Sequence, residues 1–497
     1  MTETSPKPPK GLLAYAGNWL GLAGIIVTAC SLLALLILIA FDIFLGFNRP
    51  YLGVLVYVIL PGAVFAGLLL IGAGAWHQRR LRRAPEYKPG LPYIDLNNPR
   101  HRRNVILTVC IGFVFLLFSV FGSYRAYQVT ESVAFCGLLC HQVMEPVHTT
   151  YLNSPHARVA CTRCHIGPGA SWYVRAKVSG LRQVYAVLTN SYPRPIPVPV
   201  ENLRPARETC EQCHWPEKFY GSTELLRRHY LSDTDNTPFD IRMMIKVGGA
   251  NPLHGPVGGI HWHMAVGNDI EYQPTDKSRQ TIPWVRATRA TGEVTIYQTA
   301  DSAATRGSKP PGPRRMDCID CHNRPTHIFQ SPNDALDIAL WLNRVDAAIP
   351  AIKRNAATAL VQSSGAGSRA EGLRQIDELI SAKYPDYADQ AKIRQAVAEA
   401  QNIYRNNFFP EMKTTWQVRP DNIGHRNWPG CFRCHDGEHV SATGKTISND
   451  CNACHTIISQ ALGKAPATSN LAGLPFAHPG GDIPGGLPCT LCHAGAP

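Results

Sequence analysis

Long apolar runs are confined to the first part of the chain, and apolar residues further along occur in short or periodic patterns. Three runs stand out, from about Trp19 to Leu45, from about Leu52 to Ala75 and from about Val105 to Phe121. A helix needs about 20 mainly apolar residues to cross a bilayer, and these runs approach or exceed that length. We therefore expect residues 1–123 to form a membrane anchor of three transmembrane helices.

Basic residues between the runs predict their orientation. The segment between the second and third runs carries eight Arg and Lys residues, whereas the segment between the first two carries only Arg49. Such basic segments stay on the cytoplasmic side of a membrane. The amino terminus is therefore expected in the cytoplasm and everything after Tyr124 on the outer side. The first run exceeds the h-region of a signal peptide and lacks a small-residue cleavage site after it, so we interpret it as an uncleaved anchor.

Two later regions have regular patterns. Residues 221–315 contain strand-like runs separated by Gly, Pro and Asp, at 241–247, 258–266, 281–289 and 293–299, and predict a small β-rich insertion. Residues 333–415 have apolar positions three and four residues apart and predict a helical segment. Asn333 or Asp334 is the expected N-cap of its first helix.

Cysteine spacing introduces the chemistry. Fourteen of the sixteen cysteines lie in seven related motifs, and six of these read Cys-x-x-Cys-His. The six are Cys161/Cys164/His165, Cys210/Cys213/His214, Cys318/Cys321/His322, Cys431/Cys434/His435, Cys451/Cys454/His455 and Cys489/Cys492/His493. The first motif, Cys136/Cys140/His141, has three residues between its cysteines instead of two.

The regular motif is an attachment site for c-type haem. Its two thiols bond the porphyrin vinyl groups, and the adjacent histidine becomes the proximal iron ligand. Zinc sites also use Cys-x-x-Cys pairs, but they do not require a histidine directly after the second cysteine. All seven motifs have that histidine, so we expect seven c-type haems in a periplasmic domain of a bacterial inner-membrane protein.

Low-spin haems usually take a second histidine as distal ligand. Our distal candidates lie outside the motifs and on the outer side: His156, His261, His263, His327, His425, His439 and His478. His261 and His263 are alternatives in a predicted strand, where residues two apart project to one face and Trp262 projects to the other. Which candidate serves which haem is left open by the sequence.

The expected fold class is three transmembrane helices plus a periplasmic multihaem cytochrome c domain with little regular secondary structure around the haems. After the anchor we expect a trihaem domain, the β-rich insertion, the fourth haem site, the helical segment and a C-terminal trihaem domain. Their boundaries are 124–220, 221–315, 316–332, 333–415 and 416–497.

The net charge of +13 does not indicate a nucleic-acid partner. Much of the excess lies in residues 1–123, where it sets membrane orientation, and six positive charges remain beyond them. A ferric haem with two propionates adds about one negative charge, so seven haems would offset that remainder.

Two stretches carry a family resemblance. FCGLLCHQVMEPVHTTYLNSPHARVACTRCHIGPG and RPARETCEQCHWPEKF resemble the NapC/NirT/NrfH family of membrane-anchored multihaem quinol dehydrogenases over about residues 124–220. DCIDCHNRPTH, NFFPEMKTTW and NIGHRNWPGCFRCHDGEH resemble its larger inner-membrane heptahaem members. The resemblance implies a first haem at the membrane surface that is reduced by quinol, here expected to be menaquinol.

The resemblance also implies roles for single residues. The family places a methionine, not the motif histidine, at the first iron, so Met144 or His141 is the expected ligand here. A lysine and a carboxylate flank the quinol in the family; Lys177 matches the lysine, but the carboxylate position holds Gln183 or Val184. Glu145, His148 and Asp42 are substitute proton acceptors.

We therefore expect a heptahaem cytochrome that oxidises quinol at the periplasmic face and passes electrons to a periplasmic or membrane-bound redox protein, alone or in a larger complex. One alternative is a passive electron-transfer subunit of a larger membrane enzyme. A terminal multihaem reductase is disfavoured because no Cys-x-x-Cys-Lys motif occurs. The direction of electron flow is not fixed by the sequence.

Overall fold

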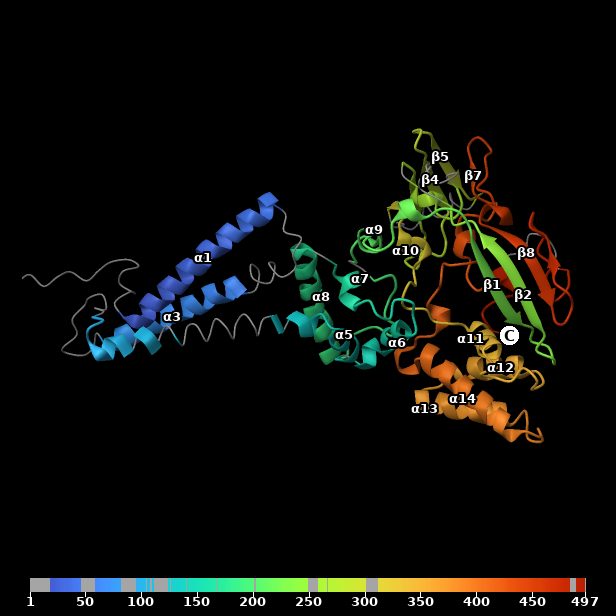
Figure 1. The fold of residues 1–497 in the computed structure, drawn as a ribbon, viewed down its shortest axis with the longest axis horizontal. Helices are drawn as coiled ribbons and strands as arrows, with labels where there is room; N and C mark the ends of the chain where they lie inside the picture. The colour runs from blue at the N-terminus through green and yellow to red at the C-terminus, as the bar shows by residue number, and fades with distance from the viewer. Residues whose placement is uncertain are drawn as a thin grey trace, which may run out of the picture. The chain divides into compact units, whose positions relative to one another are not determined.

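The computed structural model describes residues 18–45, 59–81, 95–103, 105–107, 110, 124–125, 127–139, 141–167, 169–200, 203–248, 258–265, 267–300, 312–482 and 489–496 (Figure 1). The chain forms two compact units. Unit 1 comprises residues 1–136 and 161–181, and unit 2 comprises residues 137–160 and 182–497.

Two long apolar helices begin unit 1. They are α1 (Trp19–Leu45) and α3 (Leu60–Leu81), and each contains a stretch that is long and apolar enough to cross a membrane, at Trp19–Leu38 and Leu60–His77. Large apolar side chains such as Leu36 and Phe65 are exposed on their surfaces, as expected for helices that face lipid. Two of the three expected spans thus fall on helices that could cross a membrane; most of the third, Val105–Phe121, lies outside the described residues.

Small residues let α1 and α3 approach closely. A Cβ atom on Gly24 would lie 2.7 Å from the backbone oxygen of Gly67 and 2.7 Å from the backbone nitrogen of Ile71. Asn18 adds a polar tie, because its side-chain nitrogen donates to the carbonyl of Gly74 at 2.9 Å. Glycines at helix contacts serve the same purpose in other membrane helix pairs, where close backbone packing replaces the hydrophobic effect.

We expect Gly24→Leu to destabilise the α1–α3 pair by about 1–3 kcal/mol, because the new side chain would overlap with backbone atoms that cannot rotate away. The check is the thermal midpoint of the detergent-solubilised protein, followed by size-exclusion chromatography. Gly72→Leu is the matched control, since nothing lies within 4 Å of a Cβ at that position. Equal midpoints for the two variants would rule out close packing at Gly24.

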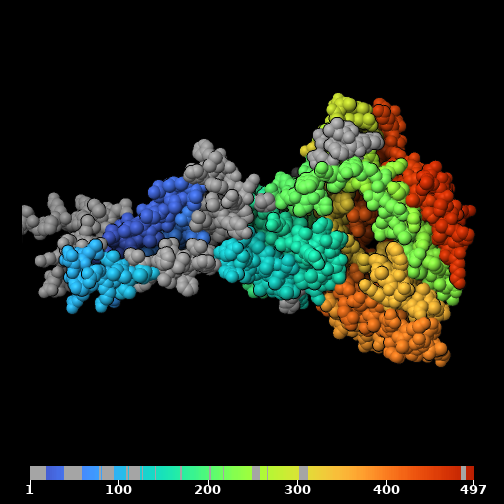
Figure 2. Space-filling view, in the orientation of Figure 1, coloured from blue at the N-terminus to red at the C-terminus, as the bar shows by residue number. Residues whose placement is uncertain are grey.

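Unit 2 contains a four-stranded antiparallel sheet in the order β1-β2-β8-β9. Its strands are β1 (Thr223–Tyr230), β2 (Pro238–Ile245), β8 (His455–Leu462) and β9 (Thr468–Ser469). The hairpin register pairs Arg228 with Asp240, and these side chains form an ion pair at 2.6 Å. The C-terminal strands lie beside the hairpin on the surface (Figure 2).

A second, five-stranded sheet has the order β6-β3-β4-β5-β7. Its strands are β3 (Asp269–Gln273), β4 (Trp284–Thr288), β5 (Val294–Gln298), β6 (Arg314–Arg315) and β7 (Val440–Ser441). The region predicted to be β-rich does form strands, but β7, β8 and β9 complete both sheets from residues 440–469, far beyond that region. The predicted strand at 258–266 is wrong where the structure describes it, because Trp262–Met264 forms a 3-10 turn.

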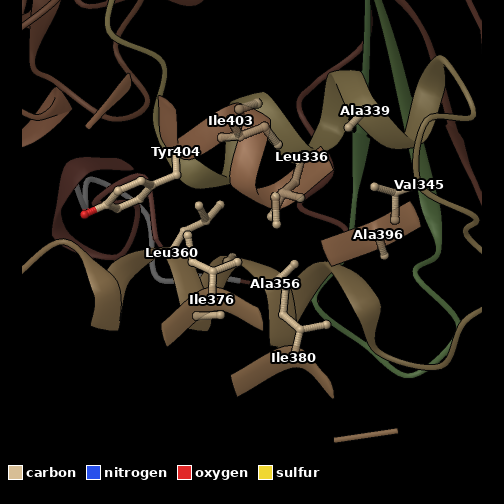
Figure 3. Close-up of a cluster of buried hydrophobic side chains, with 14 of the residues drawn as sticks. Leu336, Ala339, Val345, Ala356, Leu360, Ile376, Ile380, Ala396, Ile403 and Tyr404 are labelled. Carbon is tan, nitrogen blue, oxygen red and sulfur yellow. The ribbon is translucent and has the colours of Figure 1, made fainter. Parts of the chain in front are cut away.

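The region predicted to be helical contains α11 (Pro332–Trp341), α12 (Ile352–Ser363), α13 (Arg369–Ser381) and α14 (Gln390–Asn407). Their apolar faces meet in one core, in which Leu336, Leu360 and Ile376 are fully buried (Figure 3). The N-cap of α11 is Ser331, whose side chain accepts a hydrogen bond from the backbone of Asp334. The prediction of Asn333 or Asp334 as N-cap is wrong, because the helix already begins at Pro332, a residue that suits the first helical position.

Candidate multihaem site

The first cysteine of each regular motif lies on a short helical element. These elements are α7 (Cys161–His165), α9 (Ala206–Cys210), α10 (Cys318–Cys321) and the 3-10 turns Gly430–Arg433, Cys451–Ala453 and Cys489–Leu491. Residues three apart on a helical turn lie on one face, so the two cysteines of a motif can reach one porphyrin. In four motifs the backbone nitrogen of the histidine donates to the carbonyl of the first cysteine at 2.8 to 3.0 Å, at His214, His322, His435 and His493. This bond fixes the start of each histidine side chain beside its thiols.

The two cysteines of a motif differ in exposure in five of the six regular motifs. In four of them the first cysteine is half-buried and the second is exposed, at Cys164, Cys213, Cys321 and Cys492. In the fifth the order is reversed, with Cys451 exposed and Cys454 half-buried. Cysteine is ordinarily among the most buried residue types, so exposed thiols differ from the environment that a structural cysteine usually has. A thiol must be accessible to bond a porphyrin, and covalent attachment at these positions stays a prediction.

Five motif histidines face a second histidine from elsewhere in unit 2. The ring centroids are 6.1 Å apart in His156–His214, 6.3 Å in His261–His322, 5.8 Å in His263–His435, 6.3 Å in His425–His455 and 6.0 Å in His478–His493. An imidazole nitrogen lies about 2 Å from a transition-metal ion, which places the centroids of two imidazoles on one metal about 6 Å apart. All five spacings therefore fit one iron between the two rings.

Hydrogen bonds orient several of these distal rings. The Nδ1 atom of His261 donates to the carbonyl of Val247 at 3.0 Å, and that of His263 to the carbonyl of Ile260 at 3.1 Å. The same type of bond joins His156 to the carbonyl of Pro325 at 3.0 Å. A proton fixed on Nδ1 leaves the lone pair of Nε2 for a metal. Desolvation also lowers the pKa of His261 and of His263, which favours the neutral form that binds iron.

The remaining two candidates differ from each other. His327 shares the distal pattern, because its Nδ1 atom lies 2.9 Å from the carbonyl of Val147. His439 is buried, and both of its ring nitrogens bond to protein: Nδ1 to Asp436 at 2.8 Å and Nε2 to the carbonyl of Ile282 at 2.7 Å. In this geometry neither ring nitrogen of His439 is available to bind a metal, so His439 is not among the distal ligands that we propose.

The 3-10 turn at Trp262–Met264 changes the role of two residues. The pattern along the sequence predicts a strand in which His261 and His263 are alternative distal ligands on one face. In the turn, their rings instead meet different motif histidines, His322 and His435. Each of the two therefore has its own motif, and one short segment of chain supplies the partners of both the fourth and the fifth motif.

Pairs of cysteine sulfurs from different motifs interact directly or electrostatically. In unit 2 they are Cys210 with Cys318, Cys321 with Cys431, Cys431 with Cys454 and Cys451 with Cys489. In unit 1, Cys136 and Cys161 form such a pair. The third to seventh motifs therefore follow one another in space in the order that they have in the sequence.

Buried arginines supply a second test of whether haem fits. Arg419 is only 5% exposed, and its Nε atom has no hydrogen-bond partner among the described residues. Burial, together with repulsion from Arg419, lowers the pKa of Arg324 to about 10. Two neighbouring cations, the buried Arg419 and the half-buried Arg324, require anions, and Asp421 supplies one negative charge near Arg324. The propionates of a bound haem would supply the remaining negative charge, so the residues present fit a haem.

The irregular first motif lies on α5 (Val133–Leu138) and α6 (His141–Leu152). Cys140 and the side chain of His141 lie outside the described residues, so the choice between Met144 and His141 stays a prediction. On α6, Glu145 forms an ion pair with Arg369 of α13. His148 packs over Gly137, where a Cβ would overlap its ring, and stacks on Tyr151 with centroids 6.3 Å apart.

Unit 1 contains a carboxylate that the sequence analysis missed. Lys177 lies on α8 (Ala170–Leu188), and its Nζ atom is 3.1 Å from Glu131. The Glu131 side chain is 16% exposed and that of Lys177 38%, and both groups act electrostatically on Cys136. Gln183 is exposed on the same helix, and the side chain of Asp42 lies outside the described residues. Glu131 precedes Lys177 by 46 residues, and no spacing rule signals such a pair.

Comparisons with known proteins agree with these motifs. Residues 98–195 match the N-terminal region of the NapC/NirT cytochrome c family. The chain is 44% identical over 491 residues to the cytochrome c-type protein ImcH of Geobacter sulfurreducens, and the alignment covers 97% of this chain and 96% of that protein. No solved structure matches the chain significantly. The similarity extends over almost the whole length of both proteins, and the chain therefore belongs to the NapC/NirT cytochrome c family.

Proposed function

We propose that this protein is a multi-pass inner-membrane cytochrome that binds seven c-type haems, oxidises menaquinol at the periplasmic face and passes the electrons to a periplasmic or membrane-bound redox protein. When bound, haem supplies reversible one-electron chemistry at its iron. The seven cysteine motifs hold it covalently. The proximal ligands are His165, His214, His322, His435, His455 and His493, with Met144 or His141 in the first motif, and the distal ligands are His156, His261, His263, His327, His425 and His478.

The observation that carries this proposal is the ion pair of Lys177 and Glu131 beside Cys136. Quinol oxidation releases protons as well as electrons, so a proton acceptor is needed where the first motif meets the donor. Glu131 takes the proton from a quinol hydroxyl, and Lys177 orients the quinol oxygen by donating a hydrogen bond to it. Lys177 is the more exposed partner, so it can turn toward a quinol without leaving α8.

The aromatic rings around Lys177 suit this role. Its Nζ atom lies 4.8 Å from the centroid of Tyr173, and the Tyr127 and Tyr173 rings are 6.2 Å apart. Flat aromatic surfaces beside a cation hold the ammonium group in place and offer an apolar contact to a quinone ring. In unit 2, the sequence order of the third to seventh motifs supports a continuous path toward the C-terminal motif.

Anaerobic mixing of the purified haem-loaded protein with a menaquinol analogue tests the proposal. We expect haem reduction, followed by absorbance, that a quinol-site inhibitor abolishes. Dithionite reduction of the same sample is the control for intact haems. No reduction by quinol, with full reduction by dithionite, would contradict the proposal and favour a passive subunit. Rapid reoxidation of the reduced protein by a nitrogen or sulfur oxyanion would favour a terminal reductase instead.

A further inference from the structure

Helix α8 turns its apolar side outward. Five apolar residues recur at alternating spacings of four and three, and their exposed fractions are 44% at Val174, 63% at Val178, 72% at Leu181, 66% at Tyr185 and 81% at Leu188. Residues with these spacings lie along one stripe of a helix. A helix on the surface of a soluble domain shows the reverse pattern, with its apolar stripe against the core.

The charges of α8 are all of one sign. Its sequence, ASWYVRAKVSGLRQVYAVL, contains two arginines and a lysine but no aspartate or glutamate. Arg175 and Arg182 are seven residues apart, so they share one flank of the apolar stripe. Lys177 lies on the other flank, and the guanidinium of Arg175 is also 5.1 Å from the ring of Trp172. The helix is thus amphipathic, with cationic groups bordering an exposed apolar stripe.

Contacts along the flank that carries Lys177 fix the rotation of the helix. Lys177 is held by Glu131, and Tyr173 packs on Tyr127 with ring centroids 6.2 Å apart. The small residue Ala176 is half-buried next to these contacts. The exposed stripe is therefore a fixed feature of α8 and cannot be turned inward without breaking the ion pair.

We propose that α8 lies in the outer surface of the membrane, with the Val174–Leu188 stripe inserted below the headgroups and with Arg175 and Arg182 bound to anionic phospholipid phosphates. A helix with a strong apolar stripe and basic flanks binds a bilayer in this way without spanning it. Three basic residues exclude α8 from the candidate spans, which among the described residues are confined to α1 and α3. The first twelve residues of α8, Ala170–Leu181, belong to the same compact unit as those spans, and its last seven belong to unit 2. The proposal does not depend on quinol oxidation.

The membrane fits this face better than a protein partner does. The charged residues that α8 itself places beside the stripe are all basic. The outer headgroup layer offers phosphates at the depth that arginine side chains reach from such a stripe. A protein surface would need a matching acidic border along the full helix. The third apolar segment of this chain and a second copy of the protein are the competing occupants that the experiment must distinguish.

The test uses the full-length, haem-loaded protein in lipid nanodiscs that contain a phosphatidylcholine with a photoactivatable diazirine in its acyl chain. After illumination, mass spectrometry locates the lipid adducts. We expect adducts on residues 174–188 as well as on α1 and α3. Adducts on α1 and α3 alone would overturn the proposal, because the stripe would then be covered by protein.

Two variants separate the apolar and ionic parts. Leu181→Asn with Leu188→Asn is expected to lower labelling of α8 at least about fivefold and to leave α1 labelling unchanged. Arg175→Gln with Arg182→Gln is expected to lower α8 labelling by a similar factor in discs containing phosphatidylglycerol, and to have little effect in discs of phosphatidylcholine alone. Leu471→Asn, at an apolar residue 89% exposed in unit 2, is the control and should change nothing. Equal labelling by both lipid compositions in the wild type would overturn the anionic-lipid part.

Discussion

Replacing Glu131 with glutamine is expected to slow inhibitor-sensitive haem reduction by menaquinol about a hundredfold, because a general base contributes about 10²–10⁴ to a proton-transfer rate. Glutamine keeps the size and the hydrogen-bonding capacity of the side chain but cannot accept the quinol proton. Its amide oxygen can still accept from Lys177, so α8 should keep its place. The measurement is stopped-flow absorbance after anaerobic mixing.

Three comparisons make this result specific. Lys177→Met should also slow the quinol reaction, whereas Lys177→Arg should restore part of the rate because it keeps a cationic donor beside Glu131. Glu208→Gln is the matched control, since the Glu208 side chain is 49% exposed and pairs with Arg204, four residues earlier, at 2.7 Å. Dithionite reduction should be the same in every variant. A wild-type quinol rate in Glu131→Gln would show that the proton leaves by another group.

The sequence identifies the motifs but not the carboxylate beside Lys177, because only the motifs are specified by local spacing. The expected haem-attachment motifs occupy five or six consecutive residues, so local spacing is enough to find them. The pair of Lys177 and Glu131 spans 46 residues and depends on how α8 packs beside residues 127–131. The resemblance to known relatives points to Gln183 or Val184, but a side chain from another segment reaches Lys177 first. Under the function that we propose, the proton acceptor therefore comes from a different segment of the chain than in the relatives.

The pairing of strands in the sheets is a second feature that local sequence patterns do not predict. Alternating β-branched and apolar residues predict strands at β2, β4 and β5, because that information is local. The partner of β2 is β8, more than two hundred residues later in the chain, and nothing in either strand specifies it. Likewise, Lys353 and Asp337 form a buried ion pair at 2.5 Å between α12 and α11, which the apolar periodicity of the two helices does not reveal. Local patterns predict the elements, and long-range pairing assembles them.

Replacing His261 or His263 with alanine is expected to remove one low-spin haem from the spectrum of the oxidised protein and to add one high-spin haem. Each loss leaves the motif histidine as the sole protein ligand of its iron, and an iron with one imidazole and an open or water-filled face becomes high-spin. Electron paramagnetic resonance at low temperature counts the two species. The His439→Ala variant is the control: it should keep every low-spin signal and lose only stability, about 1–3 kcal/mol from two buried hydrogen bonds.

The ring planes make the two replacements distinguishable. His261 and His322 are nearly parallel, with an interplanar angle of 7°, whereas His263 and His435 are nearly perpendicular at 87°. Parallel imidazoles give a low-spin ferric haem a rhombic signal, and perpendicular imidazoles give one dominated by a single large g value. His261→Ala should therefore remove a rhombic signal and His263→Ala a large-g signal. Each ring orientation is fixed by its own hydrogen bond to a backbone carbonyl, so the two signals should be lost separately. If both variants lose the same signal, or if His439→Ala loses one, the assignment of His261 and His263 to separate irons is wrong.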